Sequence, residues 1–251
     1  MSGHSKWATI KHKKGAADAK RGQMFSKMAK ELMLVAKTGG GNPETNAALR
    51  ALIARCKSMS MPNDNIERAI KKGTGELGGA AMEEIMYEGY ASGGVGLIVK
   101  VLTDNKNRAA AEVRHTFTRH GSDFAAQNSV ARNFKRRGQI LVPAAGVDEG
   151  VLMELVIEAG GDDLQQDGDQ FEILTEPKAL AAVQEALEKA GIKIAECGTP
   201  MIPDLYVTVQ EKSTAKAVLN FVEALEEHDD VQEVYHNMDV SDDLMADLAK
   251  E

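Results

Sequence analysis

The sequence predicts an α+β protein in which a basic N-terminal arm and a three-helix bundle precede two ferredoxin-like α/β domains, one inserted into the other. Apolar residues recur at intervals of three and four between residues 24 and 72, which is the spacing of amphipathic helices. Residues 135–200 carry the order β-α-β-β-α-β, which is typical of a ferredoxin-like sandwich. One β-α-β pattern lies on each side of that segment, and neither buries a sheet face alone.

The composition is that of a globular protein with two or three domains. The 251 residues are 43% hydrophobic and 27% charged, and only 4% are aromatic, so aliphatic residues must build the cores. No apolar run approaches the roughly 20 residues of a membrane-spanning helix, and the first residues lack the apolar segment of a secretory signal. Cys56 and Cys197 have no metal or redox spacing. We therefore expect a cytoplasmic protein with reduced thiols and no membrane partner.

Charge divides the chain into two unlike parts. Residues 1–37 hold nine Lys or Arg and two acids, a formal charge of +7. Residues 1–79 carry a net +9 and residues 80–251 a net −17, which together give −8. A basic segment on an acidic body favours a polyanionic partner, because Lys and Arg release counterions when they meet nucleic acid. The alternative is a solvated, partly disordered tail.

The first domain is predicted to cover residues 1–79. Residues 1–22 have no apolar period and contain three glycines, so we expect a flexible arm with room for a short helical turn. Asn42 is a suitable N-cap, and Pro43 suits the first position of a helix. The three helices expected are 24–37, 43 to about 60, and 62–72. The glycine-rich segment 73–81 then forms a joint.

Two α/β domains and a tail account for the rest of the chain. The discontinuous domain, 80–134 plus 201–240, is expected to contain strands 95–102, 129–134, 205–209 and 231–236, with a helix over 105–120 and a second helix around 218–225. The inserted domain, 135–200, is expected to contain strands 139–142, 164–166, 171–174 and 192–197. Asp148 should cap its first helix, and Asp167-Gly168 should turn its hairpin. Residues 241–251 are expected to form an acidic C-terminal tail.

Residue patterns typical of enzymes are missing from the sequence. GGVG (93–96) lacks the spacing of a dinucleotide-binding loop, and no GxxxxGK phosphate loop occurs. The six histidines have no metal-ligand spacing. Glu83, Glu84 and Glu88 cluster without a nearby nucleophile, and we interpret them as a solvated face. The sequence therefore predicts no catalysis, no metal and no cofactor.

Two regions hold candidate nucleic-acid contacts. In the basic segment these are Lys6, Lys11, His12, Lys13, Lys14, Lys20, Arg21 and Lys27. In the loop TDNKNR (103–108), Asn105, Lys106 and Arg108 lie at a helix N-terminus, a place suited to anions. Asp104 and Asn105 also suit simple helix capping, so both interpretations of this loop stay open. The helix over 62–72 presents polar residues for groove contact: Asn63, Asn65, Arg68, Lys71 and Lys72.

Three stretches resemble the YebC/PmpR family: SGHSKWATIKHKKGAADAKRGQMFSK near the N-terminus, MPNDNIERAIKKGTGE (61–76) and YEGYASGGVGLIVKVLTDNKNRAAAEVRH (87–115). The resemblance runs over essentially the whole chain. It implies three domains, one of them discontinuous, and DNA-binding transcriptional regulation. The family also includes a mitochondrial translational activator, and bacterial members are linked to ribosome function. The resemblance carries Lys6, Lys11, Lys13, Lys14, Lys20 and Arg21 as nucleic-acid contacts, and no catalytic residue.

One segment departs from the family pattern. GSDFAAQNSVARNF (121–134) replaces a glycine-rich turn followed by an aromatic pair, which puts a shared partner surface there in doubt. The leading hypothesis is a non-enzymatic, DNA-binding transcriptional regulator. The alternatives are a translation factor that docks on ribosomal RNA and an enzyme with a site between the α/β domains. Phosphate contacts alone do not separate DNA from RNA.

Overall fold

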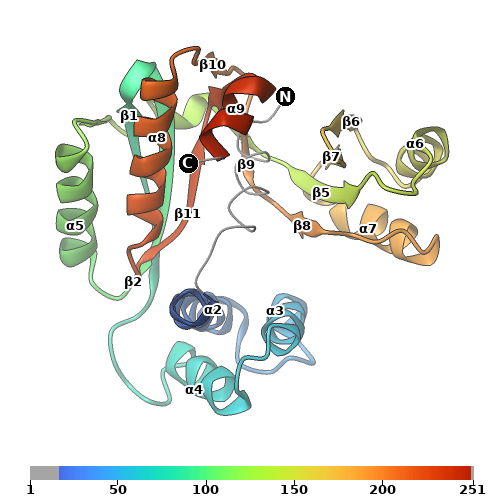
Figure 1. Ribbon diagram of the computed structural model, residues 1–251. Helices are drawn as coiled ribbons and strands as arrows, with labels where there is room; N and C mark the ends of the chain where they lie inside the picture. The colour runs from blue at the N-terminus through green and yellow to red at the C-terminus, as the bar shows by residue number, and fades with distance from the viewer. Residues whose placement is uncertain (1–16, 250–251) are drawn as a thin grey trace.

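Three helices lie beside two units of sheet and helix in the computed structural model, which describes residues 17–249 (Figure 1). The predicted α+β class, with N-terminal helices followed by α/β units, is confirmed. We call residues 17–73 the helical unit. Its helices are α2 (Ala17–Gly39), α3 (Ala47–Ser58) and α4 (Asn63–Gly73). They bury a core of their own, which consists of Met28, Leu32, Leu49, Cys56, Met61, Ile66 and Ala69.

Two predicted boundaries of the helical unit are wrong. Helix α2 begins at Ala17, so the described end of the predicted arm is helical, while residues 1–16 lie outside the described part. The N-cap of α3 is Asn46 rather than Asn42, and its side chain accepts a hydrogen bond from the Leu49 N–H at 3.0 Å. Asn42 instead accepts from the N–H of Glu44 two residues later, which makes a turn before the helix.

The first sheet, which we call the split sheet, is antiparallel with the order β11-β2-β1-β3. Its strands are β1 (Glu83–Ala91), β2 (Val95–Thr103), β3 (Asp123–Phe124) and β11 (Val231–His236), and the one-turn helix η1 (Ser92–Gly94) joins β1 to β2. Helices α5 (Lys106–Arg119) and α8 (Lys212–Glu226) cover one face (Figure 1). Phe117 and Phe221 meet edge to face at 4.8 Å in that core.

The sequence does not predict β1. Two further predictions, a solvated Glu88 and a strand over 129–134, are wrong for the same reason. Glu88 is not part of a solvated face: it is 5% exposed and lies on the sheet face away from α5 and α8. Its carboxylate accepts backbone N–H bonds from Asn128, Val130 and Ala131 at 2.7–2.8 Å. The predicted strand over 129–134 is therefore wrong, because this carboxylate, not a neighbouring strand, binds its N–H groups. The segment forms turns and η2 (Ala131–Asn133).

The second sheet, which we call the inserted sheet, has the order β6-β7-β5-β8. Its elements are β5 (Gly138–Pro143), α6 (Glu149–Glu158), β6 (Asp163–Asp167), β7 (Gln170–Thr175), α7 (Leu180–Lys189) and β8 (Glu196–Gly198). Asp148 caps α6 as predicted, at 3.0 Å from the Val151 N–H. The predicted strand over 192–197 begins too early. Pairing with β5 starts only at Ala195, whose N–H reaches the Leu141 carbonyl.

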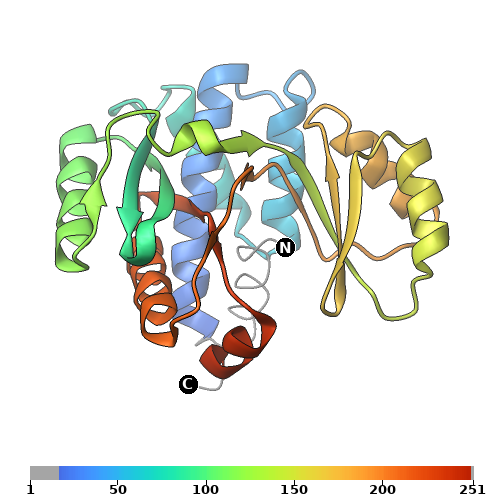
Figure 2. The same cartoon turned by 90° about the horizontal axis from the view of Figure 1, so that it is seen from above.

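Short two-stranded ribbons connect the two sheets. Strands β4 (Phe134–Arg136) and β9 (Met201–Pro203) pair antiparallel where the chain leaves the split sheet and returns to it (Figure 2). The strand predicted over 205–209 shortens to β10 (Val207–Thr208). It pairs with β12 (Met238–Asp239) and does not join the split sheet. The expected boundary at 134/135 thus falls inside β4, and the one at 200/201 falls just before β9.

The C-terminal segment contains a helix packed on the split-sheet core. In α9 (Asp242–Ala249), Met245 and Leu248 are buried among the residues that α5 and α8 contribute. The segment predicted as an acidic tail therefore completes a core. Across residues 17–249, none of the helices combines the length and apolar character needed to cross a membrane.

Candidate functional site

The structure describes only some of the predicted nucleic-acid contacts. Lys6, Lys11, His12, Lys13 and Lys14 lie outside the described residues, and Lys20 is described only as part of the α2 backbone. Arg21 is exposed near the start of α2. Lys27 is half-buried, and its ammonium donates to the carbonyl of Glu226 at the end of α8, at 3.0 Å.

The loop before α5 brings its three candidates to a junction between units. Asn105 is the N-cap of α5, and its side chain accepts from the Arg108 N–H at 3.1 Å. Lys106 makes an exposed ion pair with Glu83 at 2.6 Å. The Arg108 guanidinium lies 2.9 Å from the Asp230 carboxylate. The capping interpretation therefore describes Asn105, and a phosphate-contact role for these three residues stays a prediction.

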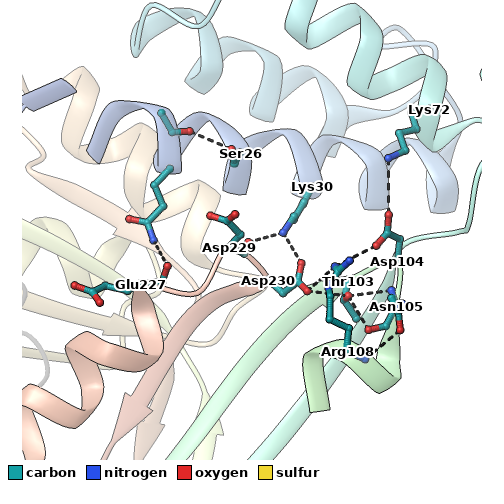
Figure 3. Close-up of polar contacts among 12 residues, drawn as sticks. Ser26, Lys30, Lys72, Thr103, Asp104, Asn105, Arg108, Glu227, Asp229 and Asp230 are labelled. Carbon is teal, nitrogen blue, oxygen red and sulfur yellow. Dashed lines mark hydrogen bonds and ion pairs between the residues drawn. The ribbon is translucent and has the colours of Figure 1, made fainter. Parts of the chain in front are cut away.

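Asp230 is the centre of this junction (Figure 3). Its side chain is 7% exposed and accepts from Lys30 of α2 at 2.6 Å, from Arg108 of α5 at 2.9 Å, and from the Thr103 hydroxyl of β2 at 3.0 Å. Burial by itself would raise the pKa of the Asp230 carboxyl. The hydrogen bonds from Lys30 and Arg108 outweigh burial and hold that pKa below its ordinary value. Asp230 is therefore a charged, fully bonded carboxylate at neutral pH.

An open recess of about 650 Å³ lies beside Asp230, between the helical unit and the split sheet. At its rim, Lys72 of α4 lies 3.9 Å from Asp104, and both side chains are more than a third exposed. The recess is lined by charges of both signs, including Arg108 and Glu112. This mixture does not select an anionic ligand. Within the described residues, no group of three or more His, Cys, Asp or Glu is placed to hold a metal ion.

A second cationic surface faces solvent on α3 and α4. Lys57, Arg68 and Lys71 are exposed, and none of them has an ion-pair partner within residues 17–249. Asn63 and Asn65 are exposed on the same helix, α4, whose buried side carries Ile66 and Ala69. We call Lys57, Arg68 and Lys71 the outer cations.

Sequence reasoning did not find Asp230, Lys30 or Gln23. The Gln23 side chain donates to the carbonyls of Glu226 and Glu227 at 3.0 and 2.9 Å. Asp230 lies 200 residues from Lys30 and 122 from Arg108 along the chain. No local pattern links such positions. The one available signal was the spacing of Gln23, Lys27 and Lys30, which places them on one side of a helix.

The fold and this junction define a class: an α+β protein in which a basic helical unit is joined by polar contacts to a sheet unit that carries an insertion. Residues 5–76 match the family model described as "TACO1/YebC protein N-terminal domain", and residues 82–238 match "TACO1/YebC second and third domain". The chain belongs to the TACO1/YebC family.

Similar proteins agree with this assignment over the full length. A protein of Treponema pallidum is 51% identical over 98% of this chain and all of its own, and one of Rubrobacter xylanophilus is 50% identical over 99% of this chain and all of its own. Both bear the name "Probable transcriptional regulatory protein". The crystal structure of a conserved hypothetical protein from Aquifex aeolicus is similar with a TM-score of 0.84 and 46% identity, covering 94% of this chain and 97% of that one.

Proposed function

We propose that this protein is a non-enzymatic, nucleic-acid-binding regulator of gene expression that acts as a DNA-binding transcriptional regulator. The observation that carries the proposal is the separation of charge: +9 on residues 1–79 against −17 on the remainder. Such a body repels a polyanion everywhere except at its basic end, so electrostatics orient that end toward nucleic acid. The names of the full-length relatives support a regulatory role.

The outer cations support the proposal from the described structure. They lie on α3 and α4 and make no ion pair within residues 17–249, although Glu67 and Glu76 line the same hollow as two of them. Asn63 and Asn65 accompany them on α4, and amide side chains can pair with base edges in a groove. The helical unit thus offers exposed cations that suit phosphates and exposed amides that suit base edges.

The arm is tested by changing Lys11, Lys13, Lys14, Lys20 and Arg21 together to Gln. Affinity for duplex DNA should fall, and the slope of log K against log salt should shrink by about 0.9 for each phosphate that the variant no longer binds. The melting temperature should hardly move, because Gln is a good helix former at Lys20 and Arg21 in α2 and the sequence before Ala17 has no apolar period to pack. An unchanged affinity and slope would remove the arm from the mechanism.

The outer cations have a matched control. Lys57, Arg68 and Lys71 changed to Gln remove three charges from the helical unit. Arg136, Lys178 and Lys193 changed to Gln remove three charges between residues 135 and 200 that are likewise exposed and make no ion pair within residues 17–249. Both triple variants lose three positive charges, so both should bind nucleic acid somewhat more weakly. The variant of the outer cations should lose more affinity than the control variant. Equal effects of the two triples would mean that the helical unit makes no local contact.

The choice between DNA and ribosomal RNA needs a separate measurement. A transcriptional regulator should prefer particular duplex sequences, and crosslinked nucleic acid from cells should map to promoters. Sedimentation with ribosomes at low salt, abolished in the arm variant and without preference for any DNA sequence, would instead identify a ribosome-associated translation factor.

A further inference from the structure

One side of α2 binds to the end of α8. Gln23 and Lys27 donate to the carbonyl oxygen of Glu226, and Gln23 also donates to that of Glu227. Lys30 donates to the Asp229 carbonyl at 2.5 Å. The last carbonyls of a helix have no partner within the helix and carry partial negative charge, so amide and ammonium donors suit them. We call Gln23, Lys27 and Lys30 the α2 stripe.

Asp230 completes this contact and is its most buried ionic group. Its carboxylate is shared by Lys30 of the helical unit and by Arg108 and Thr103 of the split-sheet unit. The same carboxylate thus binds cations from both units at once. Removing that charge leaves Lys30 and Arg108 facing each other without an anion between them.

The two units have separate cores. Their apolar cores share no residue, and the units meet through ion pairs, hydrogen bonds and a hollow that Leu34 and Leu52 of the helical unit line with Leu102 of β2. The chain connects them through the glycine-rich joint, where Gly75 and Gly78 have positive φ and no atom near the position of a Cβ. Units with separate cores that meet mainly through polar contacts move relative to one another unless a specific contact holds them.

We propose that Asp230 and the carbonyl end of α8 form a latch that masks the α2 stripe, and that nucleic-acid phosphates bind the stripe when the helical unit opens. Phosphate oxygens are acceptors of the same kind as the carboxylate and carbonyl oxygens that the stripe binds in the closed form. In the closed form, Lys27 and Lys30 do not contact nucleic acid. In the open form, both residues bind phosphates as well. The identity of the ligand rests on the proposed function, whereas the latch itself does not.

The test uses the full chain with Asp230→Asn. Small-angle scattering should show a larger radius of gyration than in the wild type. Duplex DNA should bind more tightly, with a log K against log salt slope steeper by about 0.9 for each additional lysine that binds a phosphate, up to roughly 1.8. Asp229→Asn is the matched control, since it removes the same charge from the adjacent residue, which is exposed and contributes its backbone carbonyl. The control should leave the radius of gyration unchanged.

Lys30→Gln provides a second route to the open form without disturbing the Asp230–Arg108 pair. Lys30 is partly exposed and lies outside both cores, so this variant should stay folded and also expand. Wild-type dimensions in Lys30→Gln overturn the latch. Expansion of Asp230→Asn without a steeper slope than Asp229→Asn overturns the masked surface. If no form of the protein binds nucleic acid, the proposed function fails, and the masked surface with it, while scattering still decides the latch.

Discussion

The split sheet and the inserted sheet have the same arrangement built from different chain orders. In the inserted sheet, β8-β5-β7-β6, the strands follow the order β-α-β-β-α-β. In the split sheet, β11-β2-β1-β3, strand β2 leads through α5 to β3, and α8 leads to β11, as β5 leads to β6 and α7 to β8. Strand β7 lies between β5 and β6 in the inserted sheet. In the split sheet the equivalent position, between β2 and β3, holds β1, which precedes β2 in the chain.

This difference shows what a sheet of this kind requires. The interior place between β2 and β3 needs an antiparallel strand, and pairing does not depend on where in the chain that strand lies. Because β1 already fills the place, the chain after β3 need not return at once as a hairpin. That interval holds the insertion, whereas the inserted sheet closes the same interval with a turn at Gly168.

A buried glutamate occupies one of the two interior strands of each sheet, on the face away from the helices. Glu88 in β1 is 5% exposed and Glu172 in β7 is 6% exposed. Glu88 accepts three backbone N–H bonds from residues 128–131. Glu172 is bonded to the Gln139 side chain. The first carboxylate organises a loop over its sheet, and the second is buried with fewer donors.

The largest effects should come from the two cores, and they test whether the sheets are independent. We expect Phe221→Ala to destabilise the split-sheet unit by about 3–5 kcal/mol and Leu187→Ala to destabilise the inserted unit by about 2–5 kcal/mol, because both side chains are fully buried. Hydrogen exchange should show each destabilisation in its own unit, and an excised 135–200 fragment should unfold cooperatively. Reduced protection in β2 after Leu187→Ala would contradict this independence.

The next largest effect is expected at Glu88, the better hydrogen-bonded of the two buried glutamates. Glu88→Gln should lower the free energy of unfolding by about 1.5–3 kcal/mol, since one amide oxygen replaces a carboxylate that satisfies three N–H groups. Chemical denaturation measures the change, and amide exchange of residues 128–131 should accelerate. Glu83→Gln is a control on the same strand with an exposed ion pair, and its effect should stay within about 1 kcal/mol. Equal effects of the two substitutions would show that Glu88 does not hold the loop.

The smallest expected effect is an increase in stability, on substitution of Glu172. Burial raises the pKa of the Glu172 carboxyl, against the lowering by its hydrogen bond from Gln139. A raised folded-state pKa means that stability is highest below the unfolded pKa and falls as pH rises through the folded one. Glu172→Gln should therefore raise the unfolding midpoint at pH 7, and this increase should disappear below about pH 4. Destabilisation at pH 7 would show that Glu172 is as well satisfied as Glu88.

The sequence by itself determined the elements whose causes are local. A run of apolar residues located β2, and the three-to-four spacing of apolar residues located α5. The Asp148 side chain marked the start of α6, and Asp167-Gly168 marked a hairpin. These features depend on residues within one turn or one strand of each other. The division into a basic and an acidic part is likewise a property of the chain alone.

Only the tertiary structure decided the role of β1 and of the charges around Asp230. Strand β1 carries acids and Gly89 among its apolar residues, and it forms because β2 and β3 pair with both of its edges. Arg108 and Lys27 look alike in sequence to cations free for phosphate, yet both meet acceptors more than 100 residues away. Periodicity shows that a helix has a polar side, but long-range packing determines which acceptors that side meets.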